Sequence, residues 1–130
     1  MTILDENIRE DQRELLRRWR IPVRQIGADL GRKGMKDPAI VRLLHSSRNS
    51  TFFTRDVGFY DPHLCHAGYC IVMLAVEKTE VAIFVRRMLR HRSFNTQTQR
   101  MGAVLRVSSA GISLWRLHSE TETRVVWSDE

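Results

Sequence analysis

Residues 69–75 restrict the fold of this chain more than any other part of its sequence. They read Tyr-Cys-Ile-Val-Met-Leu-Ala, a nearly unbroken apolar run that is far shorter than the roughly 20 residues of a membrane-spanning helix. A strand that is apolar on both sides has to be covered on both sides, as happens in parallel sheets with helices on their two faces. The run therefore favours an α/β fold.

Strand-like and helix-like segments alternate along the rest of the first 92 residues. Such alternation predicts β-α-β units and a mainly parallel sheet. Asp37-Pro38 marks one helix start, because Asp accepts hydrogen bonds from free N–H groups as an N-cap and Pro suits the first helical position. The predicted strands are 3–5, 23–26, 50–54 and 69–75, and the predicted helices are 8–20, one from 37 onward, and 77–92.

The C-terminal part of the chain changes character. Residues 103–107, 112–117 and 123–127 have the composition of short strands, and a Ser-Ser-Ala-Gly turn separates the first two. No linker or internal repeat interrupts the 130 residues. We therefore expect a single domain over 1–130, in which an antiparallel extension from about residue 95 joins the parallel sheet.

Charge is distributed unevenly along the chain. The 21 Lys and Arg outnumber the 15 Asp and Glu, and the formal net charge is +6. Nine of the acids lie in the first 61 residues, whereas residues 62–119 hold two acids against eight Lys and Arg. An enzyme acting on a phosphodiester could use both groups, because carboxylates hold divalent metals and Arg neutralises phosphates. The other interpretation is that helices expose charged faces and the division arises by chance.

Cys65 and Cys70 are too few and too close to form a disulfide framework. The N-terminus lacks the basic segment and following apolar segment of a signal peptide. Together with the small number of cysteines, this favours a cytoplasmic protein. Residues 61–70 also hold two His and one Asp, but the second, distant ligand pair of a structural zinc site is absent. A buried Cys70 with exposed His is the favoured interpretation.

Carboxylates follow the predicted strands. Asp5 ends the first strand and Asp56 follows the third, while Asp37 opens a helix and Asp61 lies in the loop beyond Asp56. Ligands bind beyond the carboxyl ends of strands in open parallel sheets, so these four acids and the adjacent Glu6 are expected on one rim. Unit charges about 4 Å apart repel by roughly 4 kcal/mol at an effective dielectric of about 20. The cluster therefore predicts a Mg²⁺ or Mn²⁺ site, although Asp37 alone is also explained as a helix cap.

Three segments carry a resemblance to a known family. They are residues 3–7 (Ile-Leu-Asp-Glu-Asn), 36–40 (Lys-Asp-Pro-Ala-Ile) and 53–59 (Phe-Thr-Arg-Asp-Val-Gly-Phe). In order and spacing they resemble the PIN-like nucleases, specifically the short branch encoded beside small antitoxin genes in bacteria. The resemblance covers most of the first 75 residues, and the segment from about residue 95 lies outside it.

The resemblance implies a three-layer PIN-like fold and a ribonuclease that depends on Mg²⁺ or Mn²⁺, with RNA as substrate and a cognate antitoxin as partner. It matches the catalytic, metal-binding acids to Asp5, Asp37 and Asp56. Further metal ligands would be Glu6 and Asp61, with Thr54 and Asn7 as supporting residues. The alternative is a non-catalytic PIN-like module that binds nucleic acid or protein.

The predicted helix 77–92 carries a basic side. Four arginines form it, and they are candidates for binding RNA or the acidic antitoxin: Arg86, Arg87, Arg90 and Arg92. A solvated helix face explains the same pattern. This helix and the C-terminal strands are also the surfaces through which a homodimer would form, and no membrane association is expected.

Overall fold

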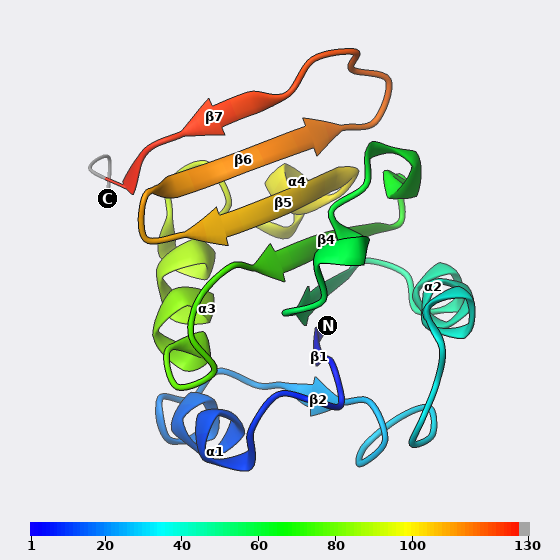
Figure 1. Cartoon of the computed structure of the whole chain (residues 1–130), viewed down its shortest axis with the longest axis vertical. Helices are drawn as coiled ribbons and strands as arrows, with labels where there is room; N and C mark the ends of the chain where they lie inside the picture. The colour runs from blue at the N-terminus through cyan, green and yellow to red at the C-terminus, as the bar shows by residue number, and fades with distance from the viewer. Residues whose placement is uncertain (128–130) are drawn as a thin grey trace.

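The apolar strand predicted at 69–75 is β4 (Tyr69–Leu74), which is buried along its whole length between β3 and β5. The computed structural model of the chain describes residues 1–127. Its seven strands form one sheet in the order β2-β1-β3-β4-β5-β6-β7 (Figure 1). Strands β1 to β5 pair in parallel, and β6 and β7 pair antiparallel. The prediction of an α/β fold with a C-terminal antiparallel extension is confirmed.

The other strands are β1 (Thr2–Leu4), β2 (Arg24–Gln25), β3 (Ser50–Thr54), β5 (Ala103–Ser108), β6 (Gly111–Arg116) and β7 (Thr123–Val125). The α-helices are α1 (Glu10–Arg18), α2 (Asp37–Ser46), α3 (Val81–Arg90) and the short α4 (Gln97–Arg100). Two 3-10 turns, η1 (Val57–Phe59) and η2 (Pro62–Leu64), lie between β3 and β4. No helix in this described part of the chain is both long and apolar enough to cross a membrane.

Two helices are shorter than their sequence patterns predict. Helix α1 begins at Glu10, two residues later than expected. Helix α3 begins at Val81, because the preceding residues form a separate turn in which the Glu80 N–H donates to the Glu77 carbonyl at 2.9 Å. The charged segment after β4 is therefore a loop at the carboxyl end of the sheet.

The sheet separates two apolar clusters, as its alternating side chains require. Leu4 and Phe53 face α1 and α3, whereas Ile3 and Phe52 face α2 and the 3-10 turns. In Figure 1, α1 and α3 lie at one side of the sheet and α2 at the other. The molecule thus has three layers, with the sheet in the middle.

The strand order reverses direction between β1 and β3. From β1 the chain returns through α1 to β2, and from β3 it returns through η1 and η2 to β4 on the other side. The connections leaving β1 and β3 therefore diverge to opposite faces, which leaves a crevice at the carboxyl ends of these strands. Open α/β sheets bind their ligands at this kind of switch point.

Candidate active site

Asp5 directly follows β1 at the switch point and is only 8% exposed. Its backbone N–H donates to the Phe53 carbonyl at 2.9 Å, which continues the pairing of β1 with β3. Its Oδ1 accepts the Glu6 N–H at 2.8 Å, and its Oδ2 accepts the Thr54 hydroxyl at 2.7 Å. Both carboxylate oxygens are thus held in place from within the protein.

Thr54 connects Asp5 to Asp56. Its Oγ1 donates to Asp5 and accepts the Asp56 N–H at 3.0 Å. Asp56 is the N-cap of η1, where its Oδ1 accepts the Gly58 N–H at 2.9 Å. One buried hydroxyl therefore sets the distance between the two segments that carry these acids.

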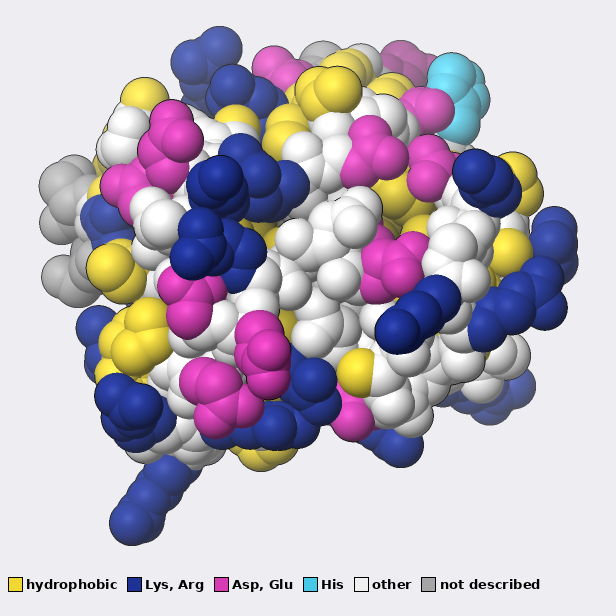
Figure 2. All heavy atoms as spheres, turned by 60° about the horizontal axis from the view of Figure 1, so that its bottom comes forward, with side chains coloured by type: hydrophobic (Ala, Val, Ile, Leu, Met, Phe, Trp, Pro, Cys, Tyr) yellow, Lys and Arg dark blue, Asp and Glu magenta, His cyan; other side chains and the backbone are white. Residues whose placement is uncertain are grey.

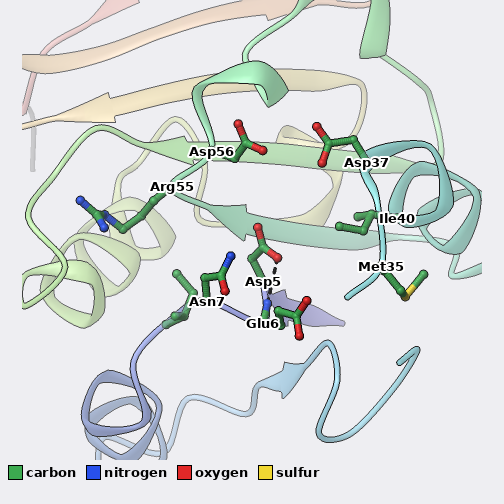
Figure 3. A pocket seen from close by; sticks show the side chains of 9 residues that line it. Asp5, Glu6, Asn7, Met35, Asp37, Ile40, Arg55 and Asp56 are labelled. Carbon is green, nitrogen blue, oxygen red and sulfur yellow. Dashed lines mark hydrogen bonds between the residues drawn. The ribbon is translucent and has the colours of Figure 1, made fainter. Parts of the chain in front are cut away.

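Asp37 reaches the same place from α2. Lys36 holds the N-cap position of this helix, so the expected capping role of Asp37 is replaced by a place in the first turn. A methyl group on Gly58 would lie 3.3 Å from Asp56 Oδ1 and 3.9 Å from Asp37 Oδ2. Figure 3 shows the Asp37 and Asp56 carboxylates facing each other, with Asp5 pointing toward both.

These side chains line a pocket of about 330 Å³, which we call the acidic pocket. Its acids come from the ends of β1 and β3 and from the start of α2, three segments far apart in the sequence. The full lining consists of Asp5, Glu6, Asn7, Ile8, Met35, Asp37, Ile40, Arg55 and Asp56.

Gln25 supports the loop that carries the first part of the pocket. The Gln25 side chain is buried on β2, beside β1. Its Nε2 donates to the carbonyls of Asp5 at 3.1 Å, Glu6 at 3.3 Å and Ile8 at 2.8 Å. One amide group therefore fixes the path of the chain from Asp5 to Ile8.

The electrostatics of the pocket disfavour an ionised Asp5. Burial raises the pKa of Asp5, and the charges of Asp56 and Glu6 raise it further. The hydrogen bonds from the Thr54 hydroxyl and the Glu6 N–H act in the opposite direction. A bound cation would stabilise the ionised form, because it would offset both the lost hydration and the repulsion.

Two predicted ligands lie differently from the other three acids. Glu6 lines the pocket, but its Oε1 accepts the Gly34 N–H at 2.8 Å, so its carboxylate is turned toward the loop before α2. Asp61 lies outside the pocket and caps η2, accepting the His63 N–H at 2.9 Å. That hydrogen bond lowers the pKa of Asp61.

Arg55 lines the pocket although it was not among the predicted site residues. Its Nε donates to the Val76 carbonyl at 3.0 Å, which holds the side chain beside the pocket. Its position between Thr54 and Asp56 was the available signal, because a residue joining two site residues stays close to the site.

The donors of the acidic pocket are carboxylates and the Asn7 amide, the oxygen ligands that Mg²⁺ and Mn²⁺ prefer. Within residues 1–127, no three His, Cys, Asp or Glu side chains stand close enough to hold an ion together as they are placed. Mg²⁺ keeps several waters and often takes only one or two carboxylates. A largely hydrated cation in this pocket would therefore contact one or two of Asp5, Asp37 and Asp56 directly and the others through its waters.

The cysteines are placed away from the acidic pocket. Cys70 is fully buried in β4, and burial raises the pKa of its thiol to about 12. Burial also raises the pKa of Cys65, which lies after η2. Both shifts disfavour the thiolate form that zinc binding requires.

The arginines of α3 lie on the helix-covered face, outside the lining of the acidic pocket. Arg86 stacks over the Trp19 ring at 3.8 Å, and Arg87 stacks over the Trp127 ring at 4.2 Å. Arg90 and Arg92 are exposed. Figure 2 shows acidic and basic side chains interspersed over the face it presents. The uneven distribution of charge along the sequence therefore does not produce separate acidic and basic surfaces there.

Neither family models, nor curated proteins, nor solved structures match this chain. The geometry of the acidic pocket at the β1/β3 switch point is therefore the basis for a functional proposal.

Proposed function

We propose that this chain is a metal-dependent endonuclease that hydrolyses phosphodiester bonds of RNA in the acidic pocket. The observation that carries the proposal is that Asp5, Asp37 and Asp56 open onto one pocket at the switch point of the sheet. Burial and the neighbouring charges disfavour an ionised Asp5 in this space of about 330 Å³, and a divalent cation there would offset that cost and suit a phosphate substrate.

The acids would differ in how rigidly they hold the cation. Asp5 is buried and fixed by two hydrogen bonds, so it would be the rigid ligand. Asp37 lies in the first turn of α2 and Asp56 is the exposed N-cap of η1, so both can adjust to the ion. When bound, the metal would neutralise phosphate charge and lower the pKa of the attacking water.

Arg55 would orient the substrate. Its Nε is engaged by the Val76 carbonyl, so its remaining guanidinium N–H groups are the ones that can donate to a phosphate beside the acids. Asn7 also lines the pocket and would donate its amide N–H to a phosphate oxygen or accept from a metal-bound water.

RNA as the substrate and a toxin role beside a cognate antitoxin come from the resemblance of residues 3–7, 36–40 and 53–59 to the PIN-like nucleases. The toxin role predicts that expression of the chain inhibits bacterial growth and that Asp5→Asn relieves the inhibition. Equal inhibition by the two proteins at equal levels would argue against it.

A non-catalytic binding module is the second candidate. One observation favours it: among residues 1–127 no three ligand side chains converge within reach of one ion as they are placed. A module of this kind would keep the fold and bind its partner without requiring a divalent metal.

Mn²⁺ binding separates the two candidates. We would titrate the wild type, Asp5→Asn and the control Asp61→Asn with Mn²⁺ by calorimetry at low salt, and assay labelled RNA with Mg²⁺, with Mn²⁺ and with EDTA. The nuclease predicts binding and cleavage in the wild type and in Asp61→Asn, and loss of both in Asp5→Asn. Absence of Mn²⁺ binding in all three proteins, with RNA left intact, would favour the binding module.

A further inference from the structure

Two further hollows continue from the acidic pocket across the carboxyl ends of the strands. The second hollow, of about 460 Å³, shares Arg55 with the acidic pocket and extends to Arg106 on β5. The third, of about 200 Å³, shares Arg106 and extends to Arg124 on β7. We call the three arginines and the hollows between them the arginine path.

Strand register places Arg106 and Arg124 on the same face of the sheet. Arg106 pairs with Ser113 of β6, and Ser113 pairs with Arg124. Directly paired residues point to the same side of a sheet. The neighbouring residues Leu105 and Leu114 belong to the cluster packed against α3, so both arginines point to the opposite face.

No α-helix of residues 1–127 covers this face of the C-terminal strands, although the η2 segment packs on it near Val104 and Trp115. In Figure 1, α3 and α4 lie behind β5 and β6, and no α-helix of the described residues lies in front of them. Arg106 and Arg124 are exposed. The arginine path therefore runs from the acidic pocket onto a sheet surface without a covering α-helix.

The cations of the path are available to a ligand. Within residues 1–127, none of the three arginines forms an ion pair with a carboxylate. Glu77 and Glu80 line the α3 side of the second hollow, where Glu80 accepts the Glu77 N–H at 3.1 Å. The acids of the second hollow thus lie on its α3 side. Farther along the path, Glu122 accepts the Tyr60 hydroxyl at 2.6 Å, and the charges of Arg106 and Arg124 act on the same tyrosine.

We propose that single-stranded RNA binds along the arginine path, with its flanking phosphates on Arg106 and Arg124 and its scissile phosphate in the acidic pocket. The proposal rests on the proposed nuclease function, which places the scissile phosphate at the end of the path that lies in the acidic pocket. Successive phosphates of a polynucleotide are linked through a ribose that also carries the base, so arginines could pair with phosphates while sugar and base occupy the hollows between them. The proposed nuclease function favours RNA over an acidic peptide as the occupant.

The test measures RNA binding without catalysis. Binding of a labelled 12-nucleotide single-stranded RNA would be followed by fluorescence anisotropy in EDTA, over a series of salt concentrations. Arg106→Ala/Arg124→Ala should weaken binding by about tenfold and reduce the slope of log affinity against log salt by about 1.4, which is about 0.7 for each lost phosphate contact. Arg106→Lys/Arg124→Lys should restore most of the slope, because it restores the two charges.

Two double variants remove the same charge elsewhere. Arg18→Ala/Arg42→Ala changes exposed residues of α1 and α2. Arg90→Ala/Arg92→Ala changes the last residue of α3 and the exposed arginine two residues beyond it, which are two of the other arginines considered for RNA binding. Both should alter binding less than twofold. Equal losses in all three doubles, or a loss confined to Arg90→Ala/Arg92→Ala, would overturn the path.

The acids of the second hollow give an independent check. Glu77→Gln/Glu80→Gln should tighten RNA binding severalfold, because it removes repulsion beside the path. Displacement of the RNA by poly-glutamate as strongly as by unlabelled RNA of equal charge would instead assign the path to an acidic peptide. If Arg106→Ala/Arg124→Ala binds RNA as the wild type does and cleaves it normally with metal, the arginine path is refuted but the nuclease is not. If RNA binding depends on the arginine path but the wild type cleaves no RNA, the nuclease is refuted but the path is not.

Discussion

The hydroxyl of Thr54 donates a 2.7 Å hydrogen bond to Oδ2 of Asp5, across the ends of two neighbouring parallel strands. Thr54→Val keeps the shape of this side chain and removes the bond. Because metal-ligand partners of this kind typically contribute roughly 10- to 100-fold to metal affinity or activity, metal-dependent cleavage should fall by about that factor. Thr54→Ser retains the hydroxyl and should stay near the wild type, and similar cleavage in the Val and Ser variants would exclude a positioning role for the bond.

Asp5→Asn should stabilise the fold at neutral pH. The pKa of Asp5 is raised in the folded protein from its ordinary value of 3.8, mainly by burial. Stability therefore falls as the pH rises between 3.8 and the folded pKa, because the folded state binds the proton more tightly in this window. The variant should gain about 0.5–2 kcal/mol over the wild type in urea unfolding at pH 7, with a smaller difference near pH 4.

Asp61→Asn should change the stability of the fold in the opposite direction. The His63 N–H lowers the pKa of Asp61, so its ionised form contributes stability that is lost as the pH falls through the folded pKa. Asp61→Asn should therefore lose stability at pH 7 relative to the wild type and converge with it in acid. Identical pH profiles for the Asp5 and Asp61 variants would contradict the contrast between the two environments.

Gln25→Leu should weaken both the fold and the site. The substitution leaves the carbonyls of Asp5, Glu6 and Ile8 without their shared donor, and a buried unpaired polar group costs about 1–3 kcal/mol. Urea unfolding should show this loss, and calorimetry should show weaker Mn²⁺ binding. Gln97→Leu, which removes one exposed hydrogen bond to the Asn49 carbonyl, is the matched control and should change neither measurement by much.

Gly58→Ala tests whether the space beside Asp56 and Asp37 must stay free for the site to work. A methyl group there would lie 3.3 Å from Asp56 Oδ1, a tight contact that should shift this carboxylate. The expected result is a drop of about tenfold in metal-dependent cleavage with an unchanged melting temperature, because small misplacements at a reacting centre have large kinetic effects. Val57→Ala alters the exposed neighbour and should cleave normally, so equal effects of the two substitutions would point to a general change in η1.

Local chemistry was enough to predict most strands. β3 was predicted at 50–54 and is Ser50–Thr54, because strand formers there are bounded by Arg55 and Asp56. The long apolar run located β4 to within one residue. The late start of α3 was missed, since a turn of charged residues after a strand has the same composition as the first turn of a helix.

The site was predictable only in part. Asp5 and Asp56 follow from the rule that ligand-binding residues lie at strand ends. Asp61 was predicted beside them because it is near Asp56 in sequence. However, η1 lies between Asp56 and Asp61, and Asp61 caps η2 outside the pocket. The meeting of Asp37 with Asp56 depends on strand order, which no local pattern encodes.

The hydrogen bond from the buried Asp5 amide to Phe53 joins the ends of two interior strands, whereas the Gly58 amide lies on an exposed turn. Native-state hydrogen exchange should therefore divide the acidic pocket into a slow half that opens only with the whole molecule and a fast half that opens locally. A ligand that bridges the two halves would slow exchange at Gly58 while leaving the Asp5 amide almost unchanged, and so would reveal its own binding through the exposed turn alone.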